Sequence, residues 1–570
     1  MDEENTNVKA GTTGTDKTNG TSDLPKEDVA THDKKRLKEV LVDIAMSTSV
    51  HGIANIVSAT KTYTRLLWLI LLLLAMVGYV FQLSQIHNTF STAQKSTTMD
   101  IRFGVQDFPG VTFCNLNPIK KSALEETSVA MRHSLTASDT YLRESANPAE
   151  YELEPSFLVF LENFKKHGFN AEEWDMGIHL PTDPYYVRDV QIKSEMRKMN
   201  RSMIERTGHN IEDILLHCAF NGIICNSSLF TPISSNRYGN CYTLKTEELV
   251  TTVPGSPYGL SLILDLETYE YVSPSSSGNG MKLVIHEPGS YPFVEEHGVN
   301  VGPGRTSIGL NRIEIQRLTP PDGNCEYNNN YVDRYGMEYS KMACEQICQI
   351  GLTEDICGCL PTISSIDPSN IISNSRFCGE DENDFLCEVV VREAQMEGRV
   401  YCSCTNPCME NVYTKTISSH SWPRQEYLIH QIIPLICEDT ERAQKVINIT
   451  GYTCDDFVLR DDLPEEAVRP FEDNFVKLEV YFEDVNYEHI EEVDAYDVYQ
   501  YLSDIGGATG LFVGASVLSL VEVVQIIVEV IKYAVNRLTK QKVVPISQEA
   551  GEVSLSPNKC KNTDIDIDRD

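Results

Sequence analysis

The sequence lacks the features that would place it among enzymes or nucleic-acid-binding proteins. It has no Gly-x-x-x-x-Gly-Lys-Ser/Thr phosphate loop, no His-Glu-x-x-His zinc pair and no Gly-x-Ser-x-Gly elbow between a strand and a helix. Basic residues are few, because 48 Lys and Arg stand against 83 Asp and Glu, a formal net charge of −35. Such a surface attracts cations and basic ligands and repels nucleic acid. We therefore expect no catalytic residue, no metal site, no cofactor and no nucleic-acid partner.

The N-terminal 30 residues contain no apolar core of a signal peptide. The first long apolar run is the uncharged stretch Leu66–Phe81, which with modest extension crosses the ~30 Å hydrocarbon layer of a bilayer. A second apolar run extends from Ile505 to Ile531. We expect the first run to act as its own signal-anchor and the second to span the membrane as well.

Positive charge lies on the outer flank of each apolar run, which predicts cytosolic ends for the chain. The flanking basic residues are Lys34, Lys35, Arg36, Lys38, Lys61 and Arg65 before the first run and Lys532, Arg537, Lys540 and Lys542 after the second. Residues 1–30 and 545–570 have the composition of disordered tails. The long segment between the two runs then lies outside the cell.

Cysteine usage agrees with this topology. Of the 17 cysteines only Cys560 falls in a predicted cytosolic tail, which leaves 16 outside. An even number of cysteines in an oxidising compartment predicts a disulfide framework. Asn200, Asn226 and Asn448 begin glycosylation sequons, as expected of a secreted surface.

Alternating apolar residues predict strands in the outer segment. The clearest are the strand that carries Leu260, Leu262, Leu264 and Leu266 and the strand that carries Val476, Leu478, Val480 and Phe482. Shorter strands are expected at 281–287 and 308–318, and helices at 122–135, 151–167, 194–207, 338–350 and 424–437. We expect the strands nearest the membrane, around 101–117 and 475–487, to share one sheet.

The second apolar run carries carboxylates on one helical face. Glu522, Gln525 and Glu529 share that face because they lie three and four residues apart. Continued toward the start of the run, the face collects Leu518, Gly514, Leu511 and Gly507. A carboxylate that faces lipid costs several kcal/mol, so this stripe suits the lining of a cation pore. Two other interpretations remain open, namely that Glu529 extends to the interface near Lys532 and that glycines such as Gly510 serve helix packing.

The spacing of other cysteines suggests a covalent ladder. Cys344 and Cys348 lie on one helix face, and Cys402 and Cys404 on one strand face. The nested hypothesis links Cys325 to Cys408, Cys344 to Cys404 and Cys348 to Cys402. Sequence alone does not fix connectivity. We expect the remaining pairs to be Cys114–Cys241, Cys218–Cys225, Cys357–Cys387, Cys359–Cys378 and Cys437–Cys454.

Five short motifs, in order and at compatible spacing, resemble the degenerin, epithelial sodium and acid-sensing channel superfamily over most of residues 45–540. They are His51-Gly52, the octapeptide Phe108-Pro109-Gly110-Val111-Thr112-Phe113-Cys114-Asn115, Tyr339-Ser340 before Cys344 and Cys348, Asp504-Ile505-Gly506-Gly507, and Gly514-Ala515-Ser516. The resemblance implies an α+β trimer with two transmembrane helices and a large disulfide-rich extracellular domain. That domain would hold a β-sheet palm with a helical finger and thumb.

The resemblance also implies a division of the chain. The expected parts are a cytosolic disordered N-terminus (1–45), a His-Gly pre-membrane segment (46–62), a first span (63–85), an extracellular domain (86–504), a second span (505–533) and a cytosolic tail (534–570). Within the extracellular domain we expect a finger at about 118–240, a thumb at about 325–437 and an insertion at 437–465, with palm strands between them.

Specific roles follow from the same resemblance. The second helix would break at Gly514, Ala515 and Ser516, and these residues would form the sodium-selective filter, where backbone carbonyls face water. His51 and Gly52 would form a re-entrant turn that lines the inner vestibule. The gate and pore would be formed by Ser503, Asp504, Gly507, Gly510, Leu511, Leu518, Glu522, Gln525 and Glu529. Amiloride would block this pore.

Departures from the superfamily pattern bear on what opens the channel. Proton-gated members carry histidines where this chain has Ala93-Gln94-Lys95, and a thumb tryptophan where it has Pro320-Pro321-Asp322-Gly323. The finger size and the pair Cys437 and Cys454 look more like the neuropeptide-gated channels, whose FMRFamide-type agonists are amidated and cationic. A candidate peptide pocket is the aromatic group Phe157, Phe160, Phe164, Trp174, Tyr185 and Tyr186, although such a stripe is more often core.

The sequence thus predicts a plasma-membrane sodium channel, a homotrimer or a heterotrimer, that is opened by an extracellular amidated neuropeptide. The alternative within the superfamily is gating by protons, bile acids or force, or constitutive opening. From another class, the chain could be a two-span surface receptor or ecto-enzyme without a pore. A trimeric ATP-gated channel shares the topology, but the acidic ectodomain lacks an evident lysine cluster for triphosphate.

Overall fold

The computed structural model describes residues 52–92, 95–137, 184–272, 278–327, 330–362, 364–367, 375–378, 382–396, 400–459 and 465–540, with a few isolated residues between them. The chain divides into two compact units. The larger unit is Lys95–Val493, and the smaller one combines the segments on either side of it, Met1–Gln94 and Asp494–Asp570.

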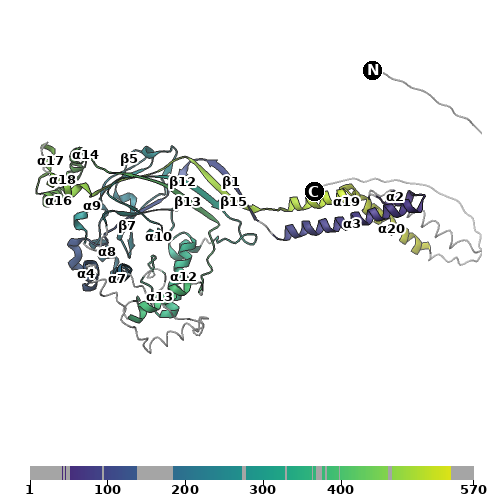
Figure 1. The fold of residues 1–570 in the computed structure, drawn as a ribbon, viewed down its shortest axis with the longest axis horizontal. Helices are drawn as coiled ribbons and strands as arrows, with labels where there is room; N and C mark the ends of the chain where they lie inside the picture. Colours follow the sequence, from purple (N-terminus) through teal and green to yellow (C-terminus); the bar gives the residue numbers. More distant parts are fainter. Residues whose placement is uncertain are drawn as a thin grey trace, which may run out of the picture. The chain divides into compact units, whose positions relative to one another are not determined.

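The larger unit is built on two main antiparallel-rich sheets (Figure 1). The eight-stranded sheet has the order β1-β15-β12-β14-β9-β4-β5, with β13 also paired to β12, and the five-stranded sheet has the order β11-β10-β3-β7-β6. A small pair, β2 (Gln106–Asp107) and β8 (Val250–Thr251), completes the described strands. The strands of the large sheet are β1 (Lys95–Phe103), β4 (Leu215–Phe220), β5 (Ile223–Ile224), β9 (Leu260–Asp265), β12 (Gly304–Gln316), β13 (Met409–His420), β14 (Phe475–Phe482) and β15 (Asn486–Asp494). Those of the smaller sheet are β3 (Gly110–Asn115), β6 (Phe230–Ser235), β7 (Gly239–Leu244), β10 (Met281–His286) and β11 (Val299–Val301).

Strand β12 organises the large sheet because it is paired along both edges. On one edge it runs antiparallel to β13, from Arg305 opposite His420 to Gln316 opposite Met409. On the other edge it runs parallel first to β14 and then to β15. A strand bonded on both edges contributes to the sheet interior and not to its exposed rim.

The core lies between the two sheets, where one face of each strand is apolar. The leucines of β9 at 260, 262 and 264 have no exposed surface, and Leu266 continues the same face. The alternating apolar residues of β14 pack into the same cluster with Phe108 and Phe113. These two predicted strands are therefore confirmed. The expected common sheet for 101–117 and 475–487 is only partly right, since β1 lies in the sheet of β14 and β15 whereas β3 lies in the other one.

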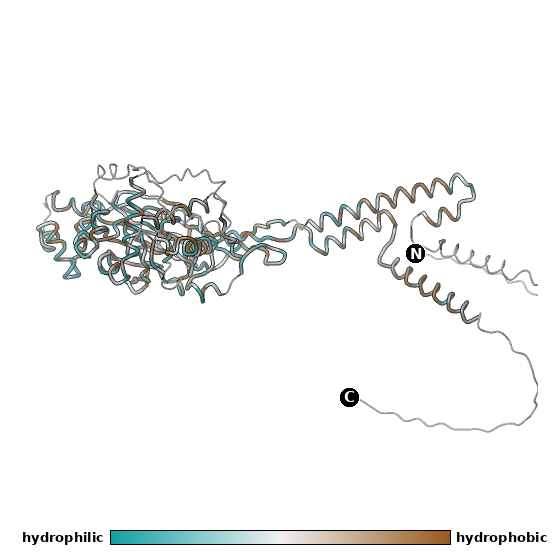
Figure 2. The backbone as a smooth tube through the Cα atoms, turned by 90° about the horizontal axis from the view of Figure 1, so that it is seen from below, coloured by the Kyte–Doolittle hydropathy of each residue, from teal (hydrophilic) through white to brown (hydrophobic). Residues whose placement is uncertain are grey.

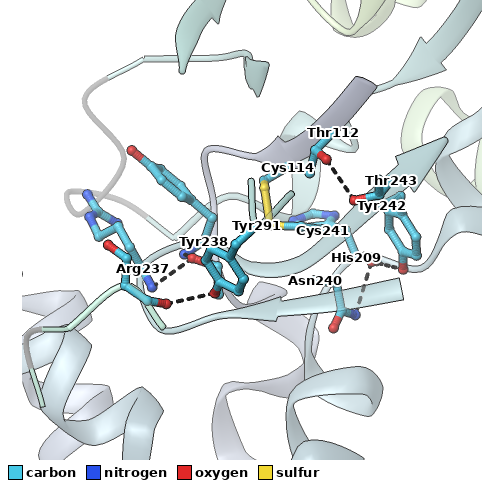
Figure 3. The surroundings of a disulfide bond; sticks show 12 residues. Thr112, Cys114, His209, Arg237, Tyr238, Asn240, Cys241, Tyr242, Thr243 and Tyr291 are labelled. Carbon is cyan, nitrogen blue, oxygen red and sulfur yellow. Dashed lines mark hydrogen bonds between the residues drawn. A yellow bond between two sulfur atoms is a disulfide. The ribbon is translucent and has the colours of Figure 1, made fainter. Parts of the chain in front are cut away.

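A disulfide crosses the smaller sheet at its centre. Cys114 of β3 lies opposite Cys241 of β7 in the strand register, with Cα atoms 4.3 Å apart. In the same pair of strands the Thr112 and Thr243 hydroxyls are 2.6 Å apart (Figure 3). The Tyr242 hydroxyl donates to the carbonyl oxygen of His209 at 2.9 Å, which ties the sheet to the segment before β4.

Helices of the larger unit break where a polar side chain caps a new turn. The segment predicted as one helix at 122–135 is a short 3₁₀ turn η1 (Lys121–Glu126) followed by α4 (Val129–Thr136), because the Ser128 hydroxyl accepts from the Met131 N–H. The predicted helix 194–207 is divided in the same way between α7 (Pro184–Lys198) and α8 (Arg201–Thr207), with Asn200 as the cap. The remaining elements of this region are α9 (Ile211–Ile214), α10 (Val294–His297), η2 (Ser227–Leu229), η3 (Ser256–Tyr258) and η4 (Thr268–Glu270).

The cysteine-rich segment folds around α12 (Lys341–Cys357) and α13 (Glu382–Met396), preceded by α11 (Asn330–Tyr335). Three of its five disulfides begin in α12, which Cys357–Cys387 joins to α13 and which Cys344–Cys404 and Cys348–Cys402 join to the chain before β13. The other two are Cys325–Cys408 and Cys359–Cys378. The eight disulfides of the structure are Cys114–Cys241, Cys218–Cys225, Cys325–Cys408, Cys344–Cys404, Cys348–Cys402, Cys357–Cys387, Cys359–Cys378 and Cys437–Cys454, the same pairs as those expected above. Both cysteines of each pair are thus held within a few ångströms by the fold.

The helices after β13 pack on the large sheet. Leu428, Ile432 and Ile433 form one apolar cluster with Leu216 of β4 and Phe475 of β14. The predicted helix 424–437 therefore covers this sheet, whereas α12 and α13 contribute to separate clusters. This group consists of α14 (Gln425–Tyr427), a π turn η6 (Leu428–Ile432), α15 (Ile433–Cys437), α16 (Thr440–Thr450), α17 (Cys454–Leu459) and α18 (Glu465–Glu472).

The smaller unit contains α2 (Ile53–Ser58), α3 (Thr62–Ser91), α19 (Val498–Phe512) and α20 (Val517–Lys540). Figure 2 shows the hydrophobic character along α3. Among the described residues α3 is the one helix long and apolar enough to cross a membrane. The second apolar run is divided between two helices, and α20 carries Glu522, Glu529 and Lys532.

Candidate functional site

The second apolar run is interrupted at a left-handed glycine. Helix α19 ends at Phe512 and α20 begins at Val517, and between them Gly514 has φ +72°. A residue with a β-carbon adopts this conformation at a cost of about 1–2 kcal/mol, so glycine suits the position. The Ser519 hydroxyl then accepts from the Ser516 N–H at 2.9 Å, which caps the start of α20. The expected filter residues Gly514, Ala515 and Ser516 thus coincide with a break in the helix, where carbonyls lack intrahelical donors.

The expected pore residues occupy both helices around this break. Ser503, Gly507, Gly510 and the 78%-exposed Leu511 lie on exposed positions of α19. Gln525 is exposed and Glu522 is half-buried on α20, and Leu518 and Glu529 occupy α20 by position, with side chains outside the described part. Asp504 accepts a hydrogen bond from the Tyr496 hydroxyl. The structure therefore places the expected pore residues on α19 and α20, on either side of the break.

Helix α19 packs closely on α3 through a small residue. A β-carbon added at Gly78 would lie 2.8 Å from the Phe512 ring, closer than real contacts allow. Beside this contact, the hydroxyl of Tyr79, the residue after Gly78, lies 3.0 Å from the hydroxyl of Thr509, one turn before Phe512. At the other end of α3, Phe90 stacks on Tyr501 with ring centroids 4.4 Å apart. Small residues that allow close backbone approach are typical of helix pairs in membranes.

The pre-membrane segment folds back on α3. Gly52 begins α2 with φ +90°, and Leu72 of α3 lies 3.8 Å from the position that its β-carbon would take. The Arg65 guanidinium donates to the carbonyls of Ile56 and Ala59 at 3.2 and 2.8 Å, so it satisfies the C-terminal end of α2. Gly52 thus occupies a turn, as expected, while His51 lies outside the described residues.

Comparisons with known proteins decide which family this arrangement belongs to. A family profile described as amiloride-sensitive sodium channel matches residues 44–526. The chain belongs to this family. Similar proteins include an FMRFamide-activated amiloride-sensitive sodium channel of Cornu aspersum (24% identical, covering 87% of this chain and 84% of that protein) and an acid-sensing ion channel 1C of Danio rerio (28%, 86% and 83%). An epithelial sodium channel gamma subunit of Pelodiscus sinensis is 24% identical over 86% and 80%.

Membership fixes the coarse function of this sodium channel family member. Its relatives are membrane ion channels and not enzymes, and they include peptide-activated, acid-sensing and epithelial types at comparable identity. The family match and the structure support a mixed α+β channel subunit whose larger unit is cross-linked by disulfides. The gating stimulus is a separate question.

The expected peptide pocket falls largely outside the described residues of this family member. Phe157, Phe160, Phe164 and Trp174 belong to 138–183, and of Tyr186 only the backbone is described. Tyr185 is 43% exposed on α7, with the Arg188 guanidinium 5.6 Å from its ring centroid. The sequon residues Asn200, Asn226 and Asn448 are all exposed, as attachment of a glycan requires.

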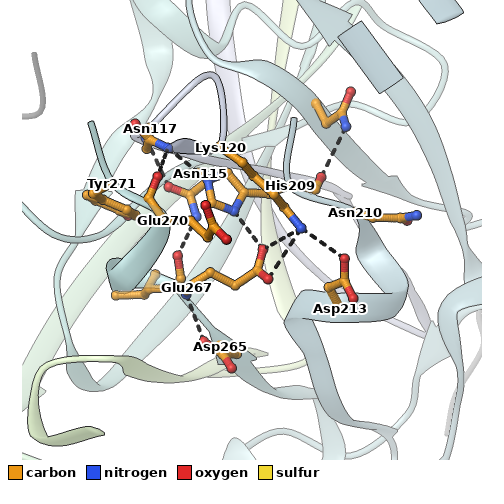
Figure 4. Close-up of polar contacts among 12 residues, drawn as sticks. Asn115, Asn117, Lys120, His209, Asn210, Asp213, Asp265, Glu267, Glu270 and Tyr271 are labelled. Atoms are coloured by element: carbon orange, nitrogen blue, oxygen red, sulfur yellow. Dashed lines mark hydrogen bonds and ion pairs between the residues drawn. The ribbon is translucent and has the colours of Figure 1, made fainter. Parts of the chain in front are cut away.

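A buried polar network that the sequence pattern does not predict lies just after the C-terminal end of β9. The Glu267 carboxylate, 1% exposed, lies 2.8 Å from His209 Nδ1 and 3.0 Å from Lys120 Nζ (Figure 4). Lys445 of α16 approaches it to 3.2 Å, and both lysines also pair with Asp213. These cations and the His209 bond lower the pKa of Glu267 to about 2 against the opposing effect of burial. The network ties the η1 segment, α9, β9 and α16 together.

Asp265 lies beside this network with the opposite electrostatic balance. Its Oδ1 accepts from the Glu267 N–H at 2.7 Å (Figure 4). It also accepts from the Asn474 side-chain amide at 2.6 Å. Burial, together with the nearby Glu267 charge, raises the pKa of Asp265 to about 7. One buried carboxylate at this joint is therefore firmly ionised, and its neighbour titrates near neutral pH.

Proposed function

We propose that the chain is a subunit of a sodium-selective, amiloride-sensitive channel that opens when an extracellular amidated neuropeptide of the FMRFamide type binds. The proposed assembly is a homotrimer in the plasma membrane with both termini in the cytosol, and the domain boundaries are those given above. A heterotrimer with related subunits is the alternative assembly.

The observation that carries the pore assignment is the glycine break between α19 and α20. Irregular backbone is tolerated at membrane depth only where it lines water or protein. Three copies of Gly514-Ala515-Ser516 would present carbonyl oxygens to a dehydrating sodium ion, and rings of Glu522 and Gln525 would hold cations on the far side. The family profile, which extends through residue 526, supports this use of the segment.

Peptide gating is supported by charge and by departures from the proton-gated pattern. An acidic ectodomain favours an amidated peptide that carries arginine, because Arg pairs with carboxylates and stacks on aromatic rings. The similarity to an FMRFamide-activated channel points the same way. Binding would stabilise one arrangement of the disulfide-braced α12–α13 segment and the finger, and β14 and β15 would transmit the change toward Asp504 and Gly507.

Expression of the chain alone in oocytes tests the proposal. Amidated Arg-Phe peptides should evoke an inward sodium current that amiloride blocks, and the free-acid peptides should be weaker. Robust current evoked by acid with none evoked by peptide would overturn peptide gating but leave the channel intact. Loss of current when a Ser516→Cys variant is treated with a thiol reagent is expected for a pore-lining position, whereas an unchanged current would contradict the filter assignment.

Acid gating is the second candidate function, because Asp265 titrates near neutral pH within a joint of four elements. The similarity to an acid-sensing channel supports it as well. It predicts a current on stepping the bath from pH 7.5 to pH 5 that the Asp265→Asn variant changes.

A further inference from the structure

A cavity of about 810 Å³ opens in the larger unit between α7 and α8, the loop that follows β10 and the segment around α11. Its volume lies within the range of small-molecule sites. None of the residues assigned above to the pore, the filter or the aromatic peptide pocket lines it. The pore and gating proposals therefore leave the cavity without a role.

The charges around the cavity are mainly positive, in contrast to the acidic chain as a whole. Arg197, Lys198 and Arg201 line it together with one carboxylate, Asp367. The Arg201 side chain is 67% exposed and pairs with Glu205 at 2.9 Å, so it can turn toward a ligand at little cost. A cationic peptide would be repelled from such a site, whereas an anion would be attracted.

Arg197 is the best-placed of these cations. Its side chain is 6% exposed, and its Nη2 donates to the carbonyls of Ser364 and Ile366 at 2.5 and 3.4 Å. Its Nη1 lies 3.5 Å from an Asp367 oxygen. Among the described residues the buried Nε–H finds no acceptor. A buried donor without an acceptor is costly, so this guanidinium favours a ligand oxygen.

Three aromatic residues, Tyr291, Tyr335 and Phe377, and several aliphatic side chains also line the cavity. The other lining residues with polar side chains are Asn200, Ser234, Thr243, His286 and Ser290. The Tyr291 hydroxyl donates to the Ser365 carbonyl at 2.8 Å, which fixes the ring at the cavity wall. Cations next to fixed aromatic rings match a molecule with an anionic head and an aromatic or alkyl body. We propose that this cavity is a binding site for a small organic carboxylate, separate from the peptide agonist and from the pore.

The test uses the purified full-length channel in detergent and three probes with the same four-carbon phenylalkyl skeleton and an anionic, a neutral or a cationic head group. These are 4-phenylbutyrate, 4-phenylbutanamide and 4-phenylbutylamine, measured by ligand-dependent thermal stabilisation and by saturation-transfer NMR. The Ser202→Ala background removes the sequon at Asn200, which also lines the cavity, and keeps the Asn200 cap of α8. Only the carboxylate should bind, with affinity that falls as salt rises.

A pair of matched variants locates the site. Lys198→Gln combined with Arg201→Gln removes two exposed cations of the cavity and should weaken 4-phenylbutyrate binding by roughly tenfold. Arg206→Gln removes one cation of α8 that is 58% exposed, against 67% for Arg201 and 36% for Lys198. Arg206 pairs with Glu126 and does not line the cavity, so binding should be unchanged. Tyr335→Ala should weaken the binding of 4-phenylbutyrate and should not enable 4-phenylbutanamide to bind. The proposal would be overturned if the three probes bound equally or if none bound at millimolar concentration. It would also be overturned if the cavity double variant and Arg206→Gln lost the same affinity for 4-phenylbutyrate.

Discussion

Replacement of Asp265 by Asn should stabilise the ectodomain at neutral and alkaline pH. The pKa of Asp265 is raised from about 4 to about 7 by burial, which means that the folded state binds this proton more tightly than the unfolded chain. The associated stability is fully present below pH ~4 and is lost as pH rises through about 7. Three pKa units at about 1.4 kcal/mol each give a penalty of up to about 4 kcal/mol at pH 8.

Asparagine removes that penalty and keeps the geometry. Its Oδ1 can accept from the Glu267 N–H and the Asn474 amide as the carboxylate does. The assay is unfolding of the purified full-length protein at pH 5 and pH 8, followed by intrinsic fluorescence. The difference in the free energy of unfolding between Asp265→Asn and wild type should be large at pH 8 and smaller at pH 5.

A control of opposite sign lies next to it. Asp213 pairs with Lys120 and Lys445 at 2.9 and 3.0 Å, and these cations lower its pKa. Asp213→Asn should therefore destabilise the protein at pH 8. The electrostatic reasoning would be refuted if Asp265→Asn were less stable than wild type at pH 8. It would also be refuted if the difference in unfolding free energy were the same at both pH values.

Three further outcomes can be checked. Gly514→Ala should strongly reduce the amiloride-sensitive current, because a φ of +72° disfavours a residue with a β-carbon. The control Gly506→Ala lies on the open face of α19 and should still conduct. Equal currents in the two variants would contradict the role of the helix break. Gly78→Val should lower the yield of assembled channel because its side chain would collide with Phe512, and unchanged gel-filtration profiles would argue against that packing. Glu267→Gln should destabilise the ectodomain by about 3–5 kcal/mol in the same unfolding assay, because it leaves buried cations uncompensated; wild-type stability would show that the network contributes little.

Local pattern was sufficient to predict much of this fold. The alternation of leucines in β9 and the long uncharged run of α3 each depend on neighbours within a few residues, and both appear where expected. The interruption of the second apolar run at Gly514 is predicted by the family resemblance instead. Periodicity of this kind can be recognised within a short contiguous segment of the sequence.

Features that depend on distant residues were not predictable in the same way. Lys445 meets Glu267 across 178 positions, and no local signal marks either residue as buried. The division of residues 101–117 between two sheets likewise depends on which strands β1 and β3 find as partners. The caps at Ser128 and Asn200 could have been found, since Ser and Asn within a helical pattern are recognised start signals.

The disulfide connectivity has a consequence for biosynthesis. In chain order the eight disulfides are nested or follow one another, and none crosses another. Cys225 pairs with Cys218 before Cys241 pairs with Cys114. Cys378, Cys387, Cys402, Cys404 and Cys408 then pair in turn with Cys359, Cys357, Cys348, Cys344 and Cys325, and Cys454 pairs last, with Cys437. When such a chain enters an oxidising lumen from its N-terminus, the second cysteine of each pair therefore forms its bond with the last preceding cysteine that is still unpaired. Simple order of translocation would select the native bonds, with little need for later reshuffling by an isomerase.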